Sequence, residues 1–168
     1  MAKKFISVLG TNDYLPCIYR CNGRDIGDLN KGLRFVQEAT IREFCKDWNS
    51  DDAIMIFTTQ ESYQKNWLDN GQEKNPGPGL QSSLNQLVNK NWFTAHIKNI
   101  DLPTGKNETE IWQMFDIIYN SIDEGDEIIF DITHAFRSIP MLVMAVLQYA
   151  ASLKNITLAG IYYGAMEA

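Results

Sequence analysis

Cysteine is scarce in this sequence, whose 168 residues include three: Cys17, Cys21 and Cys45. An odd count without metal-ligand spacing argues against a disulfide framework or a zinc site. We expect three reduced, buried thiols. The opening residues have too short an apolar part for a signal peptide, and the longest apolar run, 139–153, is too short to span a bilayer. These absences predict a cytoplasmic protein without a membrane partner.

Positive charge is also in short supply. Lysine and arginine number 15 against 21 acidic residues, a net charge of −6, so we expect no direct binding of duplex nucleic acid. A small phosphate ligand held by one or two local cations is still compatible with this balance. The sequence lacks the P-loop, the three-glycine dinucleotide fingerprint and the serine nucleophile elbow. We therefore expect no cofactor and no metal.

Short apolar runs alternate with helical patterns along the chain. The expected strands are 3–9, 53–57, 93–100, a run from Glu127 and 156–163; the expected helices are 37–48, one starting near Ser62, 80–88, 107–122 and 141–153. The buried strands read as continuous apolar runs, which is typical of a parallel sheet covered on both faces. Segments 14–21 and 32–35 flank a Gly/Asp/Asn-rich turn and predict a β-hairpin excursion after the first strand. The fold class is therefore α/β, Rossmann-like and mainly parallel, with helices on both faces.

We expect one domain over residues 1–168. The sequence stops directly after the last predicted strand, with no closing helix. A sheet domain that stops there is expected to be a piece of a longer protein.

The stretch 127–140 carries the strongest functional signal. It opens as a strand and closes with Ser138 as a predicted helix N-cap and Pro140 in the first turn. Between them lie Asp131, Thr133, His134 and Arg137. A strand that delivers polar groups to a helix N-terminus builds an anion or nucleotide site.

Two other strand ends also carry small polar residues. In a parallel sheet these ends meet at one edge, where ligands bind. Their hydroxyls, amides and backbone donors, with one cation, suit a phosphodiester or ribose-bearing ligand. The candidate ligand-binding residues are Gly10, Thr11, Asn12, Thr58, Thr59, Gln60, Thr133, His134, Arg137 and Ser138.

Each candidate also has a purely structural interpretation. Arg137 could pair with Asp131 or cap a helix, although its position in a strand-to-helix loop favours a ligand. His134 is balanced between a structural histidine and a ligand contact, and Thr11 and Asn12 could be turn residues. The Pro/Gly-rich segment 69–79 predicts either a disordered turn or a ligand lid. We expect the four tryptophans to be packing residues, with stacking on a base as the alternative for Trp67.

The run 131–140, DITHAFRSIP, resembles the signature D-[IL]-T-H-x-[FY]-R-[ST]-x-P of CRISPR-associated Rossmann-fold (CARF) domains. Residues 5–14, 35–39 and 162–165 resemble further landmarks of that family, in the same order. The signature is specific and the other segments support it. The resemblance implies a sensor domain of a type III CRISPR system, a homodimer with a two-fold groove, and a cyclic oligoadenylate as ligand. Family habit favours cyclic tetra-adenylate over the six-membered ring.

The resemblance further implies that ligand binding allosterically controls an attached antiviral effector. That effector could be a ribonuclease, DNase, deaminase, protease, membrane protein or winged-helix transcription factor. Some relatives cut their own ligand by attack of a ribose 2′-hydroxyl on the adjacent phosphate, without a metal. Thr11, Asn12, His134 and Arg137 could support that chemistry here. Pure binding is favoured over this ring-nuclease alternative, and a nucleotide-binding or dimerisation domain unrelated to CRISPR is the third hypothesis.

Overall fold

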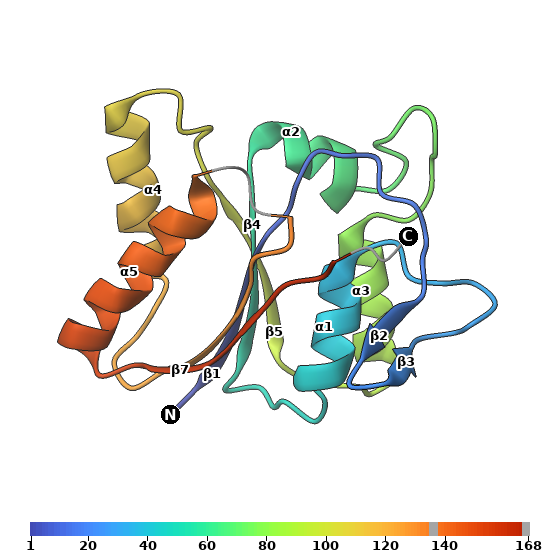
Figure 1. Cartoon of the computed structure of the whole chain (residues 1–168), viewed down its shortest axis with the longest axis horizontal. Helices are drawn as coiled ribbons and strands as arrows, with labels where there is room; N and C mark the ends of the chain where they lie inside the picture. The colour runs from blue at the N-terminus through green and yellow to red at the C-terminus, as the bar shows by residue number, and fades with distance from the viewer. Residues whose placement is uncertain (135–137, 166–168) are drawn as a thin grey trace.

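A five-stranded parallel sheet forms the centre of the fold in the computed structural model, which describes residues 1–134 and 138–165. The strands are β1 (Lys3–Val8), β4 (Ala53–Thr58), β5 (His96–Asp101), β6 (Glu127–Asp131) and β7 (Thr157–Tyr162). They lie side by side in the order β5-β4-β1-β6-β7, and each neighbouring pair is parallel (Figure 1). The α/β, Rossmann-like prediction is confirmed.

The three inner strands form because their apolar runs can be buried on both faces. All six residues of β4 are buried, as are five of the six in β1 and four of the five in β6. β5 alternates and lies at one edge, as its more polar sequence predicted. The pattern of burial therefore follows the position of each strand in the sheet.

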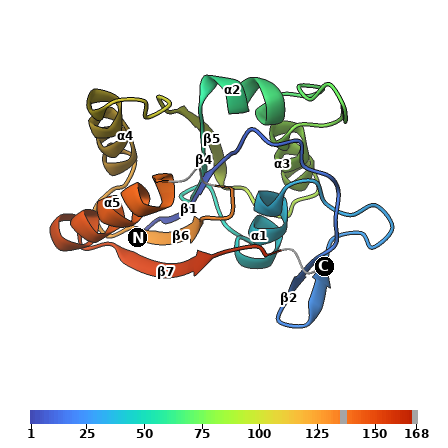
Figure 2. The same ribbon diagram turned by 45° about the horizontal axis from the view of Figure 1, so that its top comes forward.

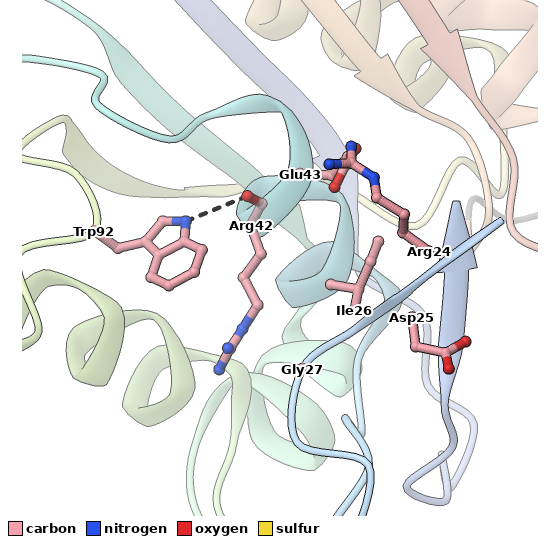
Figure 3. Close-up of a pocket in the computed structure, with 7 residues that line it drawn as sticks. All are labelled: Arg24, Asp25, Ile26, Gly27, Arg42, Glu43 and Trp92. Atoms are coloured by element: carbon pink, nitrogen blue, oxygen red, sulfur yellow. Dashed lines mark hydrogen bonds and ion pairs between the residues drawn. The ribbon is translucent and has the colours of Figure 1, made fainter. Parts of the chain in front are cut away.

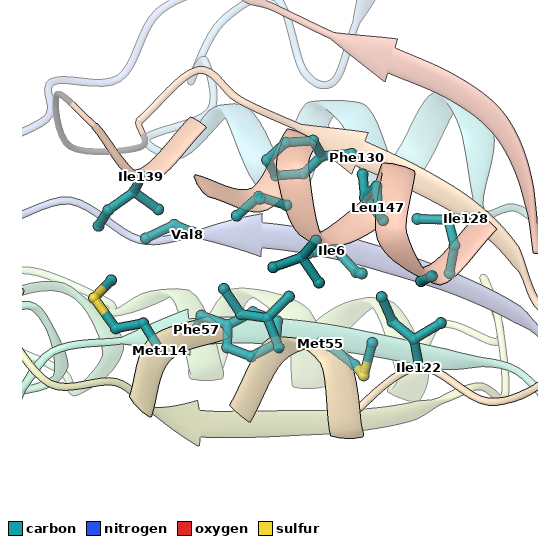
Figure 4. Close-up of a cluster of buried hydrophobic side chains, with 14 of the residues drawn as sticks. Ile6, Val8, Met55, Phe57, Met114, Ile122, Ile128, Phe130, Ile139 and Leu147 are labelled. Atoms are coloured by element: carbon teal, nitrogen blue, oxygen red, sulfur yellow. The ribbon is translucent and has the colours of Figure 1, made fainter. Parts of the chain in front are cut away.

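Helices cover both faces of the sheet. On one face, α1 (Val36–Phe44) and α3 (Leu80–Asn89) pack over a core that includes Phe5 and Ile54. On the other, α4 (Glu108–Asn120) and α5 (Ile139–Lys154) close a core that includes Ile6, Met55 and Phe130 (Figures 2 and 4). Between β4 and α3 the chain forms a short helix α2 (Gln60–Ser62) and a π-helical turn η1 (Tyr63–Trp67).

The predicted hairpin excursion exists, but its strands differ from the expected ones. β2 (Tyr19–Cys21) and β3 (Arg24–Ile26) are joined by Asn22-Gly23, both with positive φ, as a tight two-residue turn requires. The segment 32–35 contributes an isolated bridge between Leu33 and Cys17 instead of a strand. The hairpin stands away from the sheet (Figure 2); Cys21 within it is half-buried, and Cys17 before it is exposed. The expectation of buried thiols was therefore right for Cys45 alone.

The expectation of a packing residue is confirmed for Trp67, which is 3% exposed within the core and so is not available to stack on a base. The helix α5 is apolar almost all round, yet one side is uncovered in the single chain, where Met141 and Met144 are 76% and 38% exposed. Trp112 is also exposed, unlike the packing residue expected there.

Within residues 1–134 and 138–165, no helix is long and apolar enough to cross a membrane.

Candidate functional site

The site lies at the switch point of the sheet, where the order in which the chain adds strands reverses. The chain passes from β1 to β4 and β5 on one side, then crosses back through α4 to β6 and β7 on the other. β1 and β6 are therefore adjacent strands whose following loops diverge, and Ser7 is in register with Asp131. Ligands of open α/β sheets bind at such a switch point, beyond the carboxyl ends of the strands. This topology brings residues 10–12 and 132–134 together.

Three residues meet at the centre of this edge. The Tyr14 ring stacks on the His134 imidazole, with centroids 4.0 Å apart and an interplanar angle of 11°. A Cβ atom built on Gly10 would overlap the Tyr14 hydroxyl and lie 3.1 Å from the His134 carbonyl oxygen. The absence of a side chain at Gly10 therefore leaves the space into which the Tyr14 hydroxyl and the His134 carbonyl approach.

Asp131, at the end of β6, anchors the loop that follows this strand. It is completely buried, and its Oδ1 accepts hydrogen bonds from the Thr133 backbone N–H at 3.0 Å and hydroxyl at 2.6 Å. The Thr133 hydroxyl in turn accepts a hydrogen bond from the Gly164 N–H at 2.8 Å. Burial raises the pKa of Asp131 above its usual range, and hydrogen bonds from Thr133 and Ser7 oppose that shift. Asp131 and Thr133 thus fix the loop between β6 and α5 and tie it to the chain beyond β7.

In the loop after β4, two of the three candidate residues already make hydrogen bonds within the protein. The Thr58 side chain is buried and accepts a hydrogen bond from Asn99 at 2.9 Å. Thr59 is the N-cap of α2, in a reciprocal capping box with Ser62. Gln60 is exposed, so its side chain is the member of this loop that stands free for a ligand.

The remaining candidates complete the edge. Thr11 is half-buried and Asn12 is exposed. Ser138 occupies the N-cap position of α5, but its side chain makes no hydrogen bond to the described first turn, unlike the predicted cap. Arg137 lies outside the described residues. No lysine or arginine occurs in 10–12, 58–60 or 131–134, so Arg137 is the cation that the sequence offers to these loops.

Burial controls the charge of the central pair. It lowers the pKa of His134 to about 4, so the imidazole is neutral at pH 7, and its Nδ1 has no hydrogen-bond partner among the described residues. Burial also raises the pKa of Tyr14 to about 12, against the smaller effect of a hydrogen bond with the Asn12 backbone. Both stacked rings are therefore uncharged at neutral pH, and the positive charge for an anion must come from elsewhere.

His134 should make the protein less stable in mild acid. The unfolded histidine has a pKa of about 6.5 and the folded one about 4, so between these values the unfolded chain binds more protons. Stability is fully present above pH 6.5 and falls as the pH drops toward 4, by about 2 kcal/mol between pH 7 and pH 5. Urea unfolding at the two pH values measures this loss.

The matched control is His134→Phe, which keeps a ring against Tyr14 and removes the titrating group. The difference between wild type and variant isolates His134 from the carboxylates that titrate in the same range. An equal loss of stability in both proteins would contradict the assignment.

Three residues at this edge were missed from the sequence: Tyr14, Asn66 and Gln72. Tyr14 directly follows the polar segment 10–13, and it could have been found because it lies in the segment 5–14 that resembles the CARF family. Asn66 and Gln72 are 1% and 8% exposed and hydrogen-bond to the loop at 10–12. No periodicity in the sequence distinguishes a buried amide from an exposed one.

Two hollows lie beside the site instead of at the switch point. A cavity of about 180 Å³ between β3 and α1 contains the Arg24–Glu43 ion pair and the Arg42 guanidinium against Trp92 (Figure 3). A larger groove of about 760 Å³ runs between the loop at 27–34 and segment 74–78, and it touches the candidate site through Tyr14. Among the described residues, no three His, Cys, Asp or Glu side chains gather as they would around a metal ion.

The fold and the loops at its switch point define a Rossmann-like domain with a candidate ligand site beyond β1 and β6. The family model described as "CRISPR system endoribonuclease Csx1, CARF domain" matches residues 4–167. The chain therefore belongs to this CARF family, whose members are sensor domains of type III CRISPR systems.

A curated relative agrees with that assignment. The chain is 44% identical over 66 residues to "CRISPR-associated protein MJ1674" of Methanocaldococcus jannaschii. The similar segment is 38% of this chain and 10% of the relative.

Proposed function

We propose that this domain binds a cyclic oligoadenylate, with cyclic tetra-adenylate favoured, and passes the binding signal to an attached effector. CARF domains in general bind such rings. The observation that carries the proposal is the meeting of the loops at 10–12 and 133–134 at the switch point, with glycine at the point of closest approach. Backbone N–H groups and the Arg137 guanidinium would receive the phosphates.

The ring's two-fold symmetry calls for a two-fold protein site, and α5 offers a surface for a second copy. No charged residue occurs from Ile139 to Leu153, and Met141, Met144, Tyr149 and Leu153 are exposed on this helix. α5 begins directly after the loop that carries His134, so a second copy seated on it brings two such loops together. An isologous contact of this kind presents the same groups to both halves of a ring.

Binding, and not cleavage, is the function that the described geometry favours. A general base works best with a pKa near the operating pH, and the pKa of His134 is about 4. Its ring is also held against Tyr14. Slow ring cleavage would then rest on alignment of the ribose hydroxyl and charge stabilisation by Arg137 alone.

Calorimetric titration with cyclic tri-, tetra- and hexa-adenylate tests the proposal. We expect one ring to bind at one ring per two chains, and Arg137→Ala to weaken it by about 10- to 100-fold, because a charge-assisted hydrogen bond to phosphate is lost. The matched control is Arg24→Ala, since Arg24 lies on the exposed hairpin, where it pairs with Glu43 of α1. Flat titrations with all three rings would leave the chain a CARF domain with another ligand.

A further inference from the structure

Two buried side-chain amides hold the first ligand loop from behind. Asn66 Nδ2 donates hydrogen bonds to the carbonyl oxygens of Gly10 at 2.8 Å and Asn12 at 2.9 Å. Gln72 Nε2 donates to the carbonyl oxygens of Thr11 and Asn12, each at 3.1 Å, and to Asn66 Oδ1 at 3.0 Å. Three consecutive carbonyls of the loop are therefore bound by two linked side chains.

This arrangement fixes the direction of the backbone donors. In a trans peptide the carbonyl and the following N–H point in opposite directions, and the peptides concerned are trans. Because the carbonyls of residues 10–12 point at the two amides, the N–H groups of residues 11–13 point away from them. The Asn12 N–H bonds to the Tyr14 hydroxyl, so the amides orient the N–H groups of Thr11 and Asp13 as donors of the kind that receives an anion.

The segment 69–79, here called the strap, brings Gln72 to this position. A Cβ on Gly71 would overlap the carbonyl oxygen of Gln64 in η1, so glycine is needed for the strap to pass so close. At its far end the Gly79 N–H donates to Asp69 at 2.8 Å, and Asn75 donates to Asp13 at 2.6 Å. The Pro/Gly-rich composition therefore accompanies an anchored segment.

The π-helical turn provides the second amide. The Leu68 N–H bonds to the Tyr63 carbonyl at 3.1 Å, five residues back, and both Asn66 and Trp67 are buried within this turn. Trp67 fills the core while Asn66 reaches the ligand loop. Insertions of this type recur at functional sites.

We propose that Asn66 and Gln72 are positioning residues that set the anion-binding face of the loop at 10–12. The inference rests on the proposed function, since it assigns these residues to the ring's phosphate contacts. Neither side chain needs to touch the ring. They act through the carbonyls of Gly10, Thr11 and Asn12, whose orientation determines where the N–H donors point.

The test compares Gln72→Met and Asn66→Leu, which keep side-chain volume and remove the donors. For each we expect cyclic tetra-adenylate affinity to fall by about 10-fold, because the carbonyls lose their partners and the loop loses its fixed orientation. We also expect the backbone order parameters of Thr11 and Asn12, measured by NMR without ligand, to fall from about 0.85 to below about 0.6. Gln72 lies at the edge of the core, so Gln72→Met is the variant that tests the proposal if Asn66→Leu does not fold.

Two controls separate positioning from stability. Leu87→Ala empties a core position in α3, where Leu87 is 1% exposed, and should lower the melting temperature without changing affinity or order parameters. Asn75→Ala removes an exposed bond from the strap to Asp13 and should change affinity by less than about twofold.

The outcomes are distinct. Unchanged affinity and unchanged order parameters in Gln72→Met would overturn the inference, as would an equal loss of affinity in Leu87→Ala. If the wild type binds no ring, the proposed function fails, and the order parameters alone then decide whether the two amides position the loop.

Discussion

Replacement of Gly10 by alanine is expected to abolish ring binding while the sheet remains folded. The added Cβ would overlap the Tyr14 hydroxyl and crowd the His134 carbonyl oxygen at 3.1 Å, so Tyr14 and the loop at 10–12 must move apart. A shift of about 1 Å in positioning groups can cost about 100-fold. We expect at least that loss in calorimetric titration with cyclic tetra-adenylate, with a cooperative thermal unfolding transition still present.

The same geometry predicts a partial rescue. Tyr14→Phe removes the oxygen that the new Cβ would meet and leaves the ring carbon Cζ at 3.5 Å, an ordinary contact. The double variant Gly10→Ala/Tyr14→Phe should therefore recover much of the affinity, limited by the remaining contact with the His134 carbonyl. Tyr14→Phe alone is the control: it keeps the stack on His134 and loses the hydrogen bond between the Tyr14 hydroxyl and the Asn12 backbone, so its affinity sets the upper limit for the double variant. If the double variant binds no better than Gly10→Ala, the hydroxyl is not the obstacle.

The sheet could be predicted from the sequence because the buried strands of a parallel sheet are short, continuous apolar runs. Strands buried on both faces carry continuous apolar runs, and β4 and β6 contain such runs at 53–57 and 128–130, while β1 contains Phe5, Ile6 and Val8. Small polar residues at strand ends then predicted an edge where loops meet, and the adjacency of β1 and β6 brings Gly10 and His134 together. These predictions depend on local composition, which one sequence displays.

Other features depend on contacts between distant segments, and the sequence does not display those. Neither the π-helical turn at Tyr63–Trp67 nor the exposure of Cys17, beside a hairpin that stands off the sheet, was predicted. Asn66 and Gln72 are buried because loop carbonyls 56 and 61 residues away satisfy them. A buried amide with satisfied hydrogen bonds is stable, but only the folded chain shows where its partners are.

One side of α5 is apolar and exposed in the single chain. Its residues 139–153 carry no charge, as is typical of a buried helix, yet Met141 and Met144 are exposed. The contradiction disappears if a second copy covers this side, because helices that are apolar all round are buried in the assembled protein. The uncovered apolar side of α5 thus supports the proposed dimer.

Met144→Glu is expected to convert a dimer into a monomer and to remove ring binding with it. Met144 is 38% exposed on the uncharged side of α5, so a carboxylate there costs the single chain little but would face the same carboxylate or apolar side chains across a two-fold contact. Burying an unpaired charge in an interface costs several kcal/mol, so we expect the dissociation constant of the dimer to rise by more than about 100-fold. Sedimentation equilibrium measures this directly.

The control for charge alone is Asn85→Glu, an exposed position on α3 at the opposite face of the sheet. It makes the same change in net charge and should leave both dimer and ring binding intact. A Met144→Glu protein that is still dimeric and binds one ring per two chains would show that another face pairs the chains. Loss of ring binding together with the dimer would instead show that the two loops beyond β6 must come from two copies, since neither loop is altered in this variant.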